Sequence, residues 1–355
     1  AQIADAMNHS GTVVANDLNM KRLPQLRQNC ERMGVRNTVI CNANGTNLPG
    51  QNTRFDRVLV DAPCSCEGTT RKAPNLPLDT DWRFVWRQHN VQQALLAKAV
   101  QLCKVGGRIV YATCTYAPEE NEMVLENVLR HYGTDRLQMV DAAVPISRYS
   151  CGLTHWEGTD FLPGMEKAVR VWPHQNNTGG FFAAVLEKVG ETGSGDRASE
   201  SCAETHDQAE TKGEQYVQEL VDRYGIPEDL VKNASFIHGR SKQIYLAQSG
   251  KLPPPEFNIK DIGLRFIHTE GKEIRLTHPG ALDVAPYATR NTQDLGRREL
   301  QQFMERKPAG RREAELQNTC GSATYVLVRH AGVGVGIGSR RPGAGAGLGV
   351  LRSNF

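Results

Sequence analysis

The feature that most constrains the fold is an alternation of short apolar runs with longer amphipathic stretches between Gly11 and Cys114. Short apolar runs have the length of buried strands, and apolar residues at helical spacing indicate helices. The predicted strands are 12–15, 39–41, 57–60 and 108–112, and the predicted helices are 21–33 and 87–103. Strands that alternate with crossover helices form a parallel sheet. We therefore predict an α/β fold built on an open parallel sheet.

Three elements carry specific expectations. The strand at 57–60 is expected to be fully buried, as strands of parallel sheets are. Pro118 is expected to begin a helix, ahead of two acidic residues whose charges favour a helix N-terminus. The helix at 87–103 is expected to turn four apolar residues toward the core, namely Val91, Leu95, Leu96 and Val100.

The chain has 355 residues, which is too long for one small core and suits two domains. Residues 189–214 are small, polar and charged, so they cannot bury a core and are predicted to be a flexible linker. Residues 1–188 then form the first domain, and 215–312 form a small mixed α/β domain. The Gly/Ala-rich end, 330–355, is expected to be disordered.

Composition limits the classes of function. No stretch approaches the ~20 consecutive apolar residues of a membrane helix, and the first residues do not resemble a secretory signal. The net charge of +3 supports no strong electrostatic attraction to nucleic acid, so any RNA surface must be local. The nine cysteines have irregular spacings, which indicates a reduced, cytoplasmic protein. Nothing in the sequence indicates an obligate protein partner or a membrane partner.

Ligands of an open parallel sheet bind outside the carboxyl ends of its strands, so the residues that follow each strand are the first candidates. These residues are Asp17, Asn44, Asp61, Cys64 and Cys114. Asp17 suits the acidic position that accepts the ribose hydroxyls of a bound nucleotide. An Asp at a strand end is also a common turn former or helix cap, so Asp17 alone is weak evidence.

Two of the candidates are cysteines on strands that are expected to be neighbours. Cys64 lies in the segment DAPCS (61–65), and Cys114 lies in TCT (113–115). Most free cysteines are small buried hydrophobic residues. Here both thiols follow buried strands, so we expect them to face one site.

These segments resemble the Sun-type, or Fmu-like, RNA cytosine-C5 methyltransferases. The resemblance covers nearly all of residues 1–188 and rests on DAPCS and TCT in the correct order. It also includes VANDLNMKRL (14–23), VICNANGTNLP (39–49), GGRIVYATCTYAPEENE (106–122) and PHQNNTGGFFAAVLEK (173–188). The resemblance implies a class I, Rossmann-like methyltransferase sheet with S-adenosylmethionine as cofactor and rRNA or tRNA as partner.

The resemblance also implies roles for individual residues. Cys114 matches the nucleophile that adds to carbon 6 of cytosine, and Cys64 matches the second cysteine, which is linked to release of the product. Asp61 matches an Asp that contacts both the cofactor and the target base. Asp17 and Arg22 match positions of the cofactor pocket, and Asn44 stands where the family usually has an Asp beside the adenine.

Several positions depart from the family pattern. The glycine-rich cofactor loop and the first strand of the sheet should precede Ala1 and are absent, so we expect weak cofactor binding by the chain as given. Cys66 stands where the family has Gly, as a spectator thiol or as an oxidation partner of Cys64. No second Cys or His pair stands at matching spacing, so we expect no metal site.

Contacts with RNA are predicted at two places. Arg71 and Lys72 are candidates for holding RNA phosphates, and a solvated charge pair is the equally weighted alternative. Thr178 to Phe182 are more simply read as a tight turn into the last strand of the sheet. The C-terminal domain, 215–312, resembles the RNA-binding, PUA-like appendage of some family members, above all at 258–282.

Two competing functions remain open at this point. One is a catalytically incompetent RNA-binding fragment or paralogue, which the absent cofactor loop favours and the intact thiol pair disfavours. The other is a methyltransferase of small molecules or proteins, which has no use for two thiols in its cleft. The expectation that best fits the residues is an enzyme that forms 5-methylcytosine through a covalent Cys–cytosine adduct.

Overall fold

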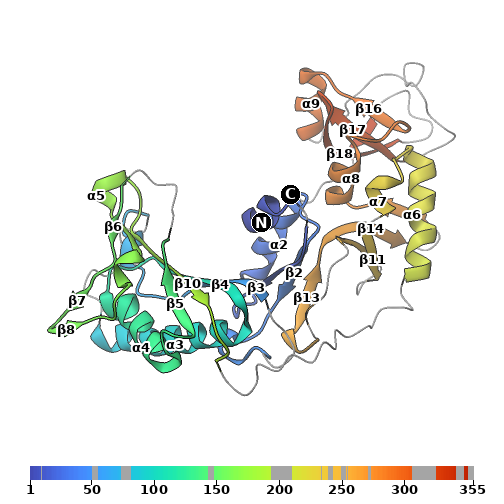
Figure 1. The fold of residues 1–355 in the computed structure, drawn as a ribbon. Coiled ribbons are helices and arrows are strands. Elements are labelled where there is room, and N and C mark those ends of the chain that lie inside the picture. Colours follow the sequence, from blue (N-terminus) through green and yellow to red (C-terminus); the bar gives the residue numbers. More distant parts are fainter. Residues whose placement is uncertain are drawn as a thin grey trace. The chain divides into compact units, whose positions relative to one another are not determined.

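The computed structural model shows a mixed α/β protein (Figure 1). It describes residues 1–8, 10–49, 55–72, 81–142, 148–192, 210–232, 234–238, 243–248, 253, 255–270, 273–305, 325–340 and 348–350. The chain divides into two compact units, which we call the central unit, residues 43–202, and the terminal unit, residues 1–42 with 203–355. This division differs from the predicted domain boundaries, because the first 42 residues group with the C-terminal part of the chain.

The central unit is built on a six-stranded sheet in the order β3-β4-β10-β9-β6, with β5 also paired to β10. Its strands are β3 (Phe55–Asp61), β4 (Cys103–Thr113), β5 (Leu137–Val140), β6 (Ser150–Cys151), β9 (Val169–Val171) and β10 (Phe181–Lys188). β3 and β4 are parallel, and their register places Asp61 opposite Ala112. The carboxyl ends of both strands therefore lie at the same edge of the sheet.

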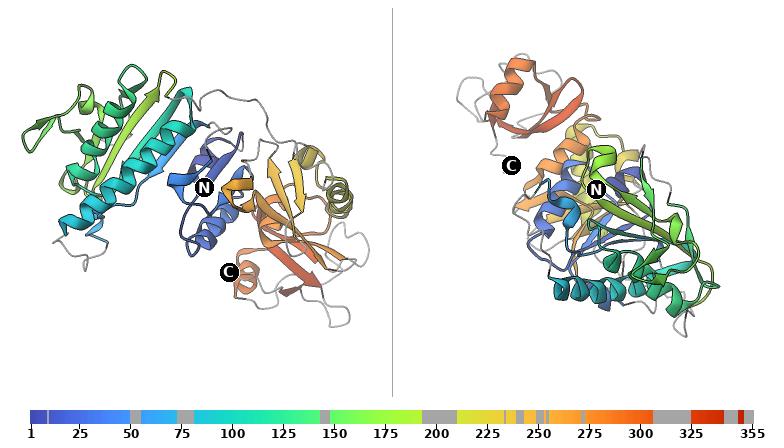
Figure 2. Two further views of the ribbon diagram at one scale, coloured as in Figure 1. Left: turned by 90° about the horizontal axis from the view of Figure 1, so that it is seen from below. Right: turned by 90° about the vertical axis from the view of Figure 1, so that its left-hand side faces the viewer.

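Helices α3 (Trp82–Leu102) and α4 (Glu122–Tyr132) lie side by side along this sheet (Figure 2). Leu96 and Val100 of α3 pack with Leu125 of α4 and Ile109 of β4 in one buried cluster. The other elements of the unit are η1 (Gly45–Asn47), η2 (Glu67–Thr69), η3 (Pro118–Glu120), η4 (Met165–Lys167), α5 (Pro173–Asn176), β7 (His155–Trp156) and β8 (Thr159–Asp160). As predicted, Pro118 occupies the first position of a helical turn.

Two burial expectations in this unit are wrong. Val91 is 42% exposed, because the buried stripe of α3 passes through Val85, Leu96 and Val100 and turns Val91 outward. Leu59 of β3 is 51% exposed, so this strand is not fully buried, and in the described part of the chain β3 pairs with β4 alone at the edge of its sheet.

A buried ion pair ties α4 to β9. Arg170 donates from Nε to Glu122 over 2.7 Å and from a terminal nitrogen to the other carboxylate oxygen, and the two side chains are 4% and 0% exposed. The same guanidinium donates to the carbonyl of Tyr116 and packs over the rings of Trp172 and Phe182. Two charges buried this deeply need each other, because either alone would be left without solvent or counter-charge.

The terminal unit joins two distant parts of the chain. Its N-terminal part contains α1 (Gln2–Ala6), β1 (Val13–Asn16), α2 (Leu23–Arg32) and β2 (Thr38–Cys41), and β1 and β2 are parallel. On the other side of β2, strand β13 (Ile259–Ile262) is added antiparallel. Ion pairs reinforce this junction, namely Arg27–Asp261, Glu31–Arg265 and Arg36–Asp283. These contacts explain why residues 1–42 belong to this unit.

The C-terminal part of this unit contains two further sheets. The first has strands β11 (Ala234–His238), β12 (Gln243–Gln248), β14 (Leu264–Glu270) and β15 (Glu273–Leu276), and the second has β16 (Thr292–Asp294), β17 (Tyr325–His330), β18 (Val333–Arg340) and β19 (Leu348–Val350). The helical elements are α6 (Glu210–Tyr224), α7 (Asp229–Lys232), η5 (Pro255–Phe257), α8 (His278–Val284) and α9 (Arg297–Met304). Most of the predicted linker, at 193–209, falls outside the described residues, and its last residues begin α6.

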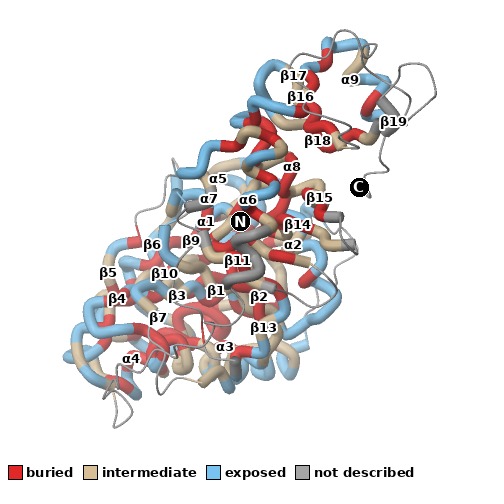
Figure 3. The backbone as a smooth tube through the Cα atoms, turned by 90° about the vertical axis from the view of Figure 1, so that its right-hand side faces the viewer, coloured by how far each residue is buried: buried red, intermediate tan, exposed pale blue. Residues whose placement is uncertain are grey.

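The expectation of disorder from residue 330 onward is wrong for β18. This strand pairs with β17, whose Val326, Leu327 and Val328 are fully buried (Figure 3). The Gly-rich composition concealed an alternation of Val333, Val335 and Ile337 with glycines, which is the period of a strand. In the described part of the chain, no helix is both long and apolar enough to cross a membrane.

We predict that Arg170→Ala lowers the free energy of unfolding of the central unit by about 3–5 kcal/mol, because it leaves the Glu122 carboxylate buried and unpaired. All four tryptophans lie in this unit, so tryptophan fluorescence during urea unfolding measures its stability separately. The control is Arg108→Ala, which breaks the more exposed pair with Glu187 and should cost at most about 1 kcal/mol. Equal losses in both variants would contradict a structural role for the buried pair.

A three-cysteine candidate active site

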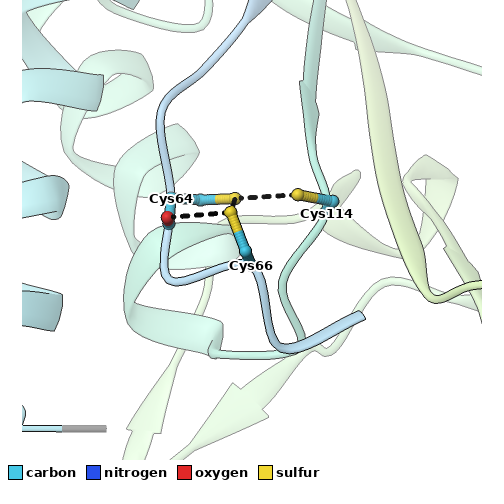
Figure 4. Close-up of side chains that lie close together, drawn as sticks. All are labelled: Cys64, Cys66 and Cys114. Carbon is cyan, nitrogen blue, oxygen red and sulfur yellow. Dashed lines mark hydrogen bonds between the residues drawn. The ribbon is translucent and has the colours of Figure 1, made fainter. Parts of the chain in front are cut away.

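Three thiols meet at the carboxyl edge shared by β3 and β4 (Figure 4). Cys64 lies three residues beyond the end of β3, and Cys114 directly follows β4. The Cys64 sulfur is 3.3 Å from the Cys114 sulfur and 4.0 Å from the Cys66 sulfur. The prediction that Cys64 and Cys114 face one site is confirmed, and Cys66 joins them.

The chain after β3 is fastened to the chain after β4 by backbone hydrogen bonds. Ala62 donates to Ala112 over 3.0 Å, and Gly68 donates to the Cys114 carbonyl over 2.8 Å. A β-carbon at Gly68 would lie 2.4 Å from the carbonyl oxygen of Gly180 and 2.9 Å from that of Cys114. Only glycine lets the backbone at residue 68 lie this close to the Gly180 and Cys114 carbonyls. Gly68 therefore holds the loop that carries Cys64 and Cys66 against the residue that follows β4.

A buried carboxylate lies beneath the thiol-bearing turn. Glu120 is 0% exposed and accepts hydrogen bonds from the Ser65 backbone N–H at 3.0 Å and from the Gln92 amide at 2.7 Å. Gln92 also donates to the carbonyl of Pro63 over 2.8 Å. Burial raises the pKa of Glu120 against the lowering effect of these hydrogen bonds. Because Ser65 stands between Cys64 and Cys66, the carboxylate fixes the backbone that presents both thiols.

Hydroxyl groups connect the same turn to the segment after β4. The Ser65 and Thr115 hydroxyls are 2.6 Å apart, and Thr115 donates to the Glu67 carboxylate over 3.1 Å. Thr113 donates to the Asn121 amide oxygen over 2.6 Å, and Asn121 donates back to the Thr115 carbonyl. Cys114 therefore lies between two threonines whose hydroxyl groups both donate hydrogen bonds to neighbouring side chains.

The thiols share one negative charge. The Cys64 thiol donates to the Cys114 sulfur, and this contact, with a smaller one from Cys66, lowers the pKa of Cys114 to about 6 despite burial. The pKa of Cys64 is raised by the same hydrogen bond and by burial. Burial raises the pKa of Cys66, and its contact with Cys114 adds to the rise. At neutral pH the cluster therefore holds a Cys114 thiolate beside the protonated thiols of Cys64 and Cys66.

Two predicted cofactor residues lie in the terminal unit. Asp17 follows β1, is 30% exposed, and accepts the backbone N–H of Asn19 at 2.7 Å. Arg22 is 73% exposed, and its guanidinium lies 3.7 Å from the Asp17 carboxylate. A partly exposed carboxylate at the end of a parallel strand, held by one backbone contact, fits the acceptor that ribose hydroxyls need.

The other two predicted cofactor residues lie in the central unit. Asn44 is exposed, but its amide oxygen accepts both the Thr46 N–H at 3.1 Å and the Thr46 hydroxyl at 2.9 Å. That oxygen has two lone pairs, so an adenine amino group would have to displace one of these contacts. Asp61 is the last residue of β3, exposed, and its negative charge acts on Cys114.

The predicted RNA-contacting residues behave differently from each other. Arg71 donates to the Asn177 side chain at 2.7 Å and to the Thr178 carbonyl at 3.2 Å, whereas Lys72 is exposed. The segment after Thr178 leads directly into β10, and Gly180 donates to the Gly68 carbonyl over 2.9 Å. Arg71 thus braces this segment beside the thiol-bearing loop.

Reasoning from the sequence missed the polar groups that hold the site. Gln92 and His89 lie on the buried stripe of α3, and His89 bonds to the Glu119 carbonyl and to Asn127. Polar residues within an apolar helical stripe need buried partners, which was the available signal. Glu120 was predicted only as a favourable charge near a helix N-terminus, and its role as an acceptor for the turn was not anticipated.

Comparisons with known proteins find relatives named as rRNA and tRNA methyltransferases. Ribosomal RNA small subunit methyltransferase F of Vibrio cholerae serotype O1 (strain M66-2) is 35% identical over 189 residues, which cover 53% of this chain and 38% of the relative. The multisite-specific tRNA:(cytosine-C(5))-methyltransferase of Saccharomyces cerevisiae is 33% identical over 276 residues, covering 64% of this chain and 40% of the relative. A 28S rRNA (cytosine-C(5))-methyltransferase of Mus musculus is 33% identical over 214 residues, covering 59% and 26%.

The chain therefore spans between 26% and 40% of the length of these curated relatives. Among solved structures, NSun6 from Pyrococcus horikoshii with SFG is 28% identical, with a TM-score of 0.45 over 53% of this chain and 44% of that chain. The family model described as 16S rRNA methyltransferase RsmB/F matches residues 1–187. Because this match spans more than half of the 355 residues and includes all three cysteines of the site, the chain belongs to the RsmB/F methyltransferase family.

Proposed function

We propose that this chain carries the catalytic site of an S-adenosylmethionine-dependent RNA cytosine-C5 methyltransferase that acts on rRNA or tRNA. The observation that carries the proposal is the contact between the Cys114 and Cys64 sulfurs, which lie 3.3 Å apart at the ends of two neighbouring parallel strands and whose hydrogen bond lowers the pKa of Cys114. The names of the Vibrio cholerae, mouse and yeast relatives, which include rRNA and tRNA methyltransferases, support the substrate class.

Carbon 5 of cytosine is too weak a nucleophile to accept a methyl group unaided. The Cys114 thiolate forms a bond to carbon 6, and the displaced π-electrons make carbon 5 nucleophilic, with a proton taken up at ring nitrogen 3. Asp61, exposed at the end of β3, would stabilise that proton. Because its pKa is lowered, Cys114 needs no separate base to become a nucleophile at neutral pH.

S-adenosylmethionine supplies an electrophilic methyl group for carbon 5 when it is bound. In this chain, Asp17 would accept the ribose hydroxyls, with Arg22 beside it. Asn44 would approach the adenine ring only if one of its two contacts with Thr46 is released. The fit of the cofactor is therefore strongest at Asp17.

In the last step a base takes the proton from carbon 5, the double bond between carbons 5 and 6 re-forms, the Cys114 sulfur leaves as a thiolate, and ring nitrogen 3 returns its proton to solvent. Cys64 is a poor base while Cys114 is a thiolate, because its proton is bound to that charge. Once Cys114 has become a thioether, the charge and the strong acceptor are both gone, and the pKa of Cys64 must fall. We infer that addition by Cys114 itself prepares Cys64 for the release step.

The residues that contact RNA and the cellular location of the protein are also proposals. Lys72 of the central unit and the C-terminal residues 215–312 are proposed to contact RNA, the latter from their likeness to PUA-like appendages. Arg71 would contribute only after leaving Asn177 and Thr178. A cytoplasmic location is proposed because the chemistry requires reduced thiols, and seven cysteines are free in the described part of the chain.

We predict that Cys114→Ala in the full-length protein abolishes methylation of RNA and covalent trapping on RNA that contains 5-fluorocytosine, because of the three thiols only Cys114 has a lowered pKa, so its loss removes the thiolate. Trapping is measured as a slowly migrating, protease-sensitive band on a denaturing gel. Cys151→Ala, which removes an exposed thiol of the same unit, is the control and should trap normally. Turnover retained by Cys114→Ala would overturn the assignment of the nucleophile.

Cys64→Ala should accumulate a covalent complex with ordinary RNA in the presence of S-adenosylmethionine, because addition and methyl transfer proceed while release fails. The double variant Cys64→Ala/Cys114→Ala should give no such complex. If Cys64→Ala turns over normally and Cys66→Ala traps RNA instead, the release role belongs to Cys66.

The pH dependence of the reaction of Cys114 with iodoacetamide should reveal its lowered pKa. The thiolate is present above about pH 6, so the alkylation rate should rise through that pH and level off below neutrality. In Cys64→Ala the midpoint should move upward, toward the ordinary cysteine value of about 8.5, because the strongest thiol donor is lost. Mass spectrometry of the Cys114 peptide, in buffer with a metal chelator, measures the rate. An unchanged midpoint in Cys64→Ala would contradict the shared charge.

A further inference from the structure

The third thiol of the site, Cys66, has no step in the proposed reaction. It occupies a left-handed backbone conformation with φ of 62° at the start of η2, a conformation that favours glycine. Its thiol donates to the Cys64 carbonyl over 3.3 Å, and its sulfur lies beside that of Cys64, with Cys114 facing both (Figure 4). A disfavoured conformation thus places a third sulfur where the catalytic pair already lies.

The three sulfurs have the spacing of a metal site. All three lie within 4.8 Å of one another, with Cys64 at 3.3 Å from Cys114 and 4.0 Å from Cys66. A zinc–thiolate bond is about 2.3 Å long, so three thiolates around one tetrahedral ion lie roughly 3.8 Å apart. Shifts of less than about 1 Å would therefore seat one ion between the sulfurs.

The surroundings suit an ion that enters from solvent. Cys64 is buried, whereas Cys66 and Cys114 are partly exposed, so the open side of the cluster faces outward. The Glu120 and Gln92 hydrogen bonds hold the turn that carries two of the three sulfurs. Three sulfur ligands select soft or borderline ions such as Zn²⁺ and Cd²⁺ over Mg²⁺ or Ca²⁺, and they leave a fourth position open.

We propose that Cys64, Cys66 and Cys114 bind one soft divalent metal ion, Zn²⁺ by preference, and that the bound ion blocks the nucleophile. Three metal–sulfur bonds form, and the thiol protons leave to solvent. The ion then holds the electron pair with which Cys114 attacks carbon 6, so metal and RNA compete for one sulfur. The binding site stands on geometry alone, and the competition rests on the proposed function.

Spacing along the sequence predicted no metal site, because Cys64 and Cys66 have no second pair of ligands nearby. The third ligand comes from a different strand, 50 residues away from Cys64 in the sequence. Among the Cys, His, Asp and Glu side chains of the described residues, these three cysteines lie close enough together to share an ion. Only the pairing of β3 with β4 reveals it.

The binding test uses Cd²⁺ and Co²⁺ with the reduced, metal-free full-length protein and no RNA. We expect one ion per chain, an ultraviolet thiolate-to-Cd²⁺ charge-transfer band, and visible Co²⁺ bands of a tetrahedral sulfur-rich site. Cys66→Gly, which also suits the left-handed backbone, should weaken binding at least about tenfold, the effect that loss of even an outer partner produces. Cys151→Ser is the control and should bind like the parent. No thiolate band, or equal binding by Cys66→Gly, would overturn the site.

The competition test measures trapping on 5-fluorocytosine RNA with and without Zn²⁺, each protein being compared with its own metal-free sample. Zn²⁺ should suppress trapping by the parent protein, a chelator should restore it, and Cys66→Gly should resist Zn²⁺ at the same concentration. If the thiolate-to-Cd²⁺ band forms but the metal-free protein does not trap RNA, the metal site is supported and the proposed function is rejected. If the metal-free protein traps RNA but no band forms, the proposed function is supported and the metal site is rejected. If Zn²⁺ does not affect trapping, the competition is rejected.

Discussion

The structure of the site depends on one buried carboxylate. Glu120 is inaccessible to solvent, so it must be satisfied by protein donors, and it takes them from the Ser65 backbone and from Gln92. The turn that bears Cys64 and Cys66 therefore has to lie over this carboxylate. Since Gly68 also bonds to the Cys114 carbonyl, the same loop cannot move away from β4 without breaking contacts at both ends.

The consequence of this fixed geometry is one lowered pKa among three neighbouring thiols. Cys114 carries the negative charge, and Cys64 donates a hydrogen bond to it, so a change at Cys114 alters the pKa of Cys64. In the proposed reaction, addition to a pyrimidine would remove the charge and free Cys64, whereas a metal ion would hold all three thiolates at once. The proposed attack on cytosine and the proposed metal binding both use the same lone pair of the Cys114 sulfur. The metal ion and the RNA therefore cannot occupy Cys114 at the same time.

Local periodicity in the sequence was enough to predict the strand ends and the residues beside them. Functional residues of a parallel sheet gather at those ends, so Cys64, Cys114 and Asp61 were predicted as site residues without coordinates. The buried face of α3 was misjudged at Val91, because apolar residues on several faces allow more than one register. The contacts of Glu120 with Ser65 and Gln92 are tertiary, and no spacing rule contains them. Likewise, the grouping of residues 1–42 with the C-terminal part depends on β13 joining β2, a pairing between segments far apart in the chain.

The central claim is that Cys114, and neither of the two neighbouring thiols, forms the bond to cytosine. The most direct test is to trap the full-length protein on 5-fluorocytosine RNA with S-adenosylmethionine, digest the complex with protease and ribonuclease, and locate the nucleotide by mass spectrometry. The account predicts a methylated fluorocytosine nucleotide on the Cys114 sulfur, with Cys64 and Cys66 unmodified. Attachment to Cys64 or Cys66 would contradict it.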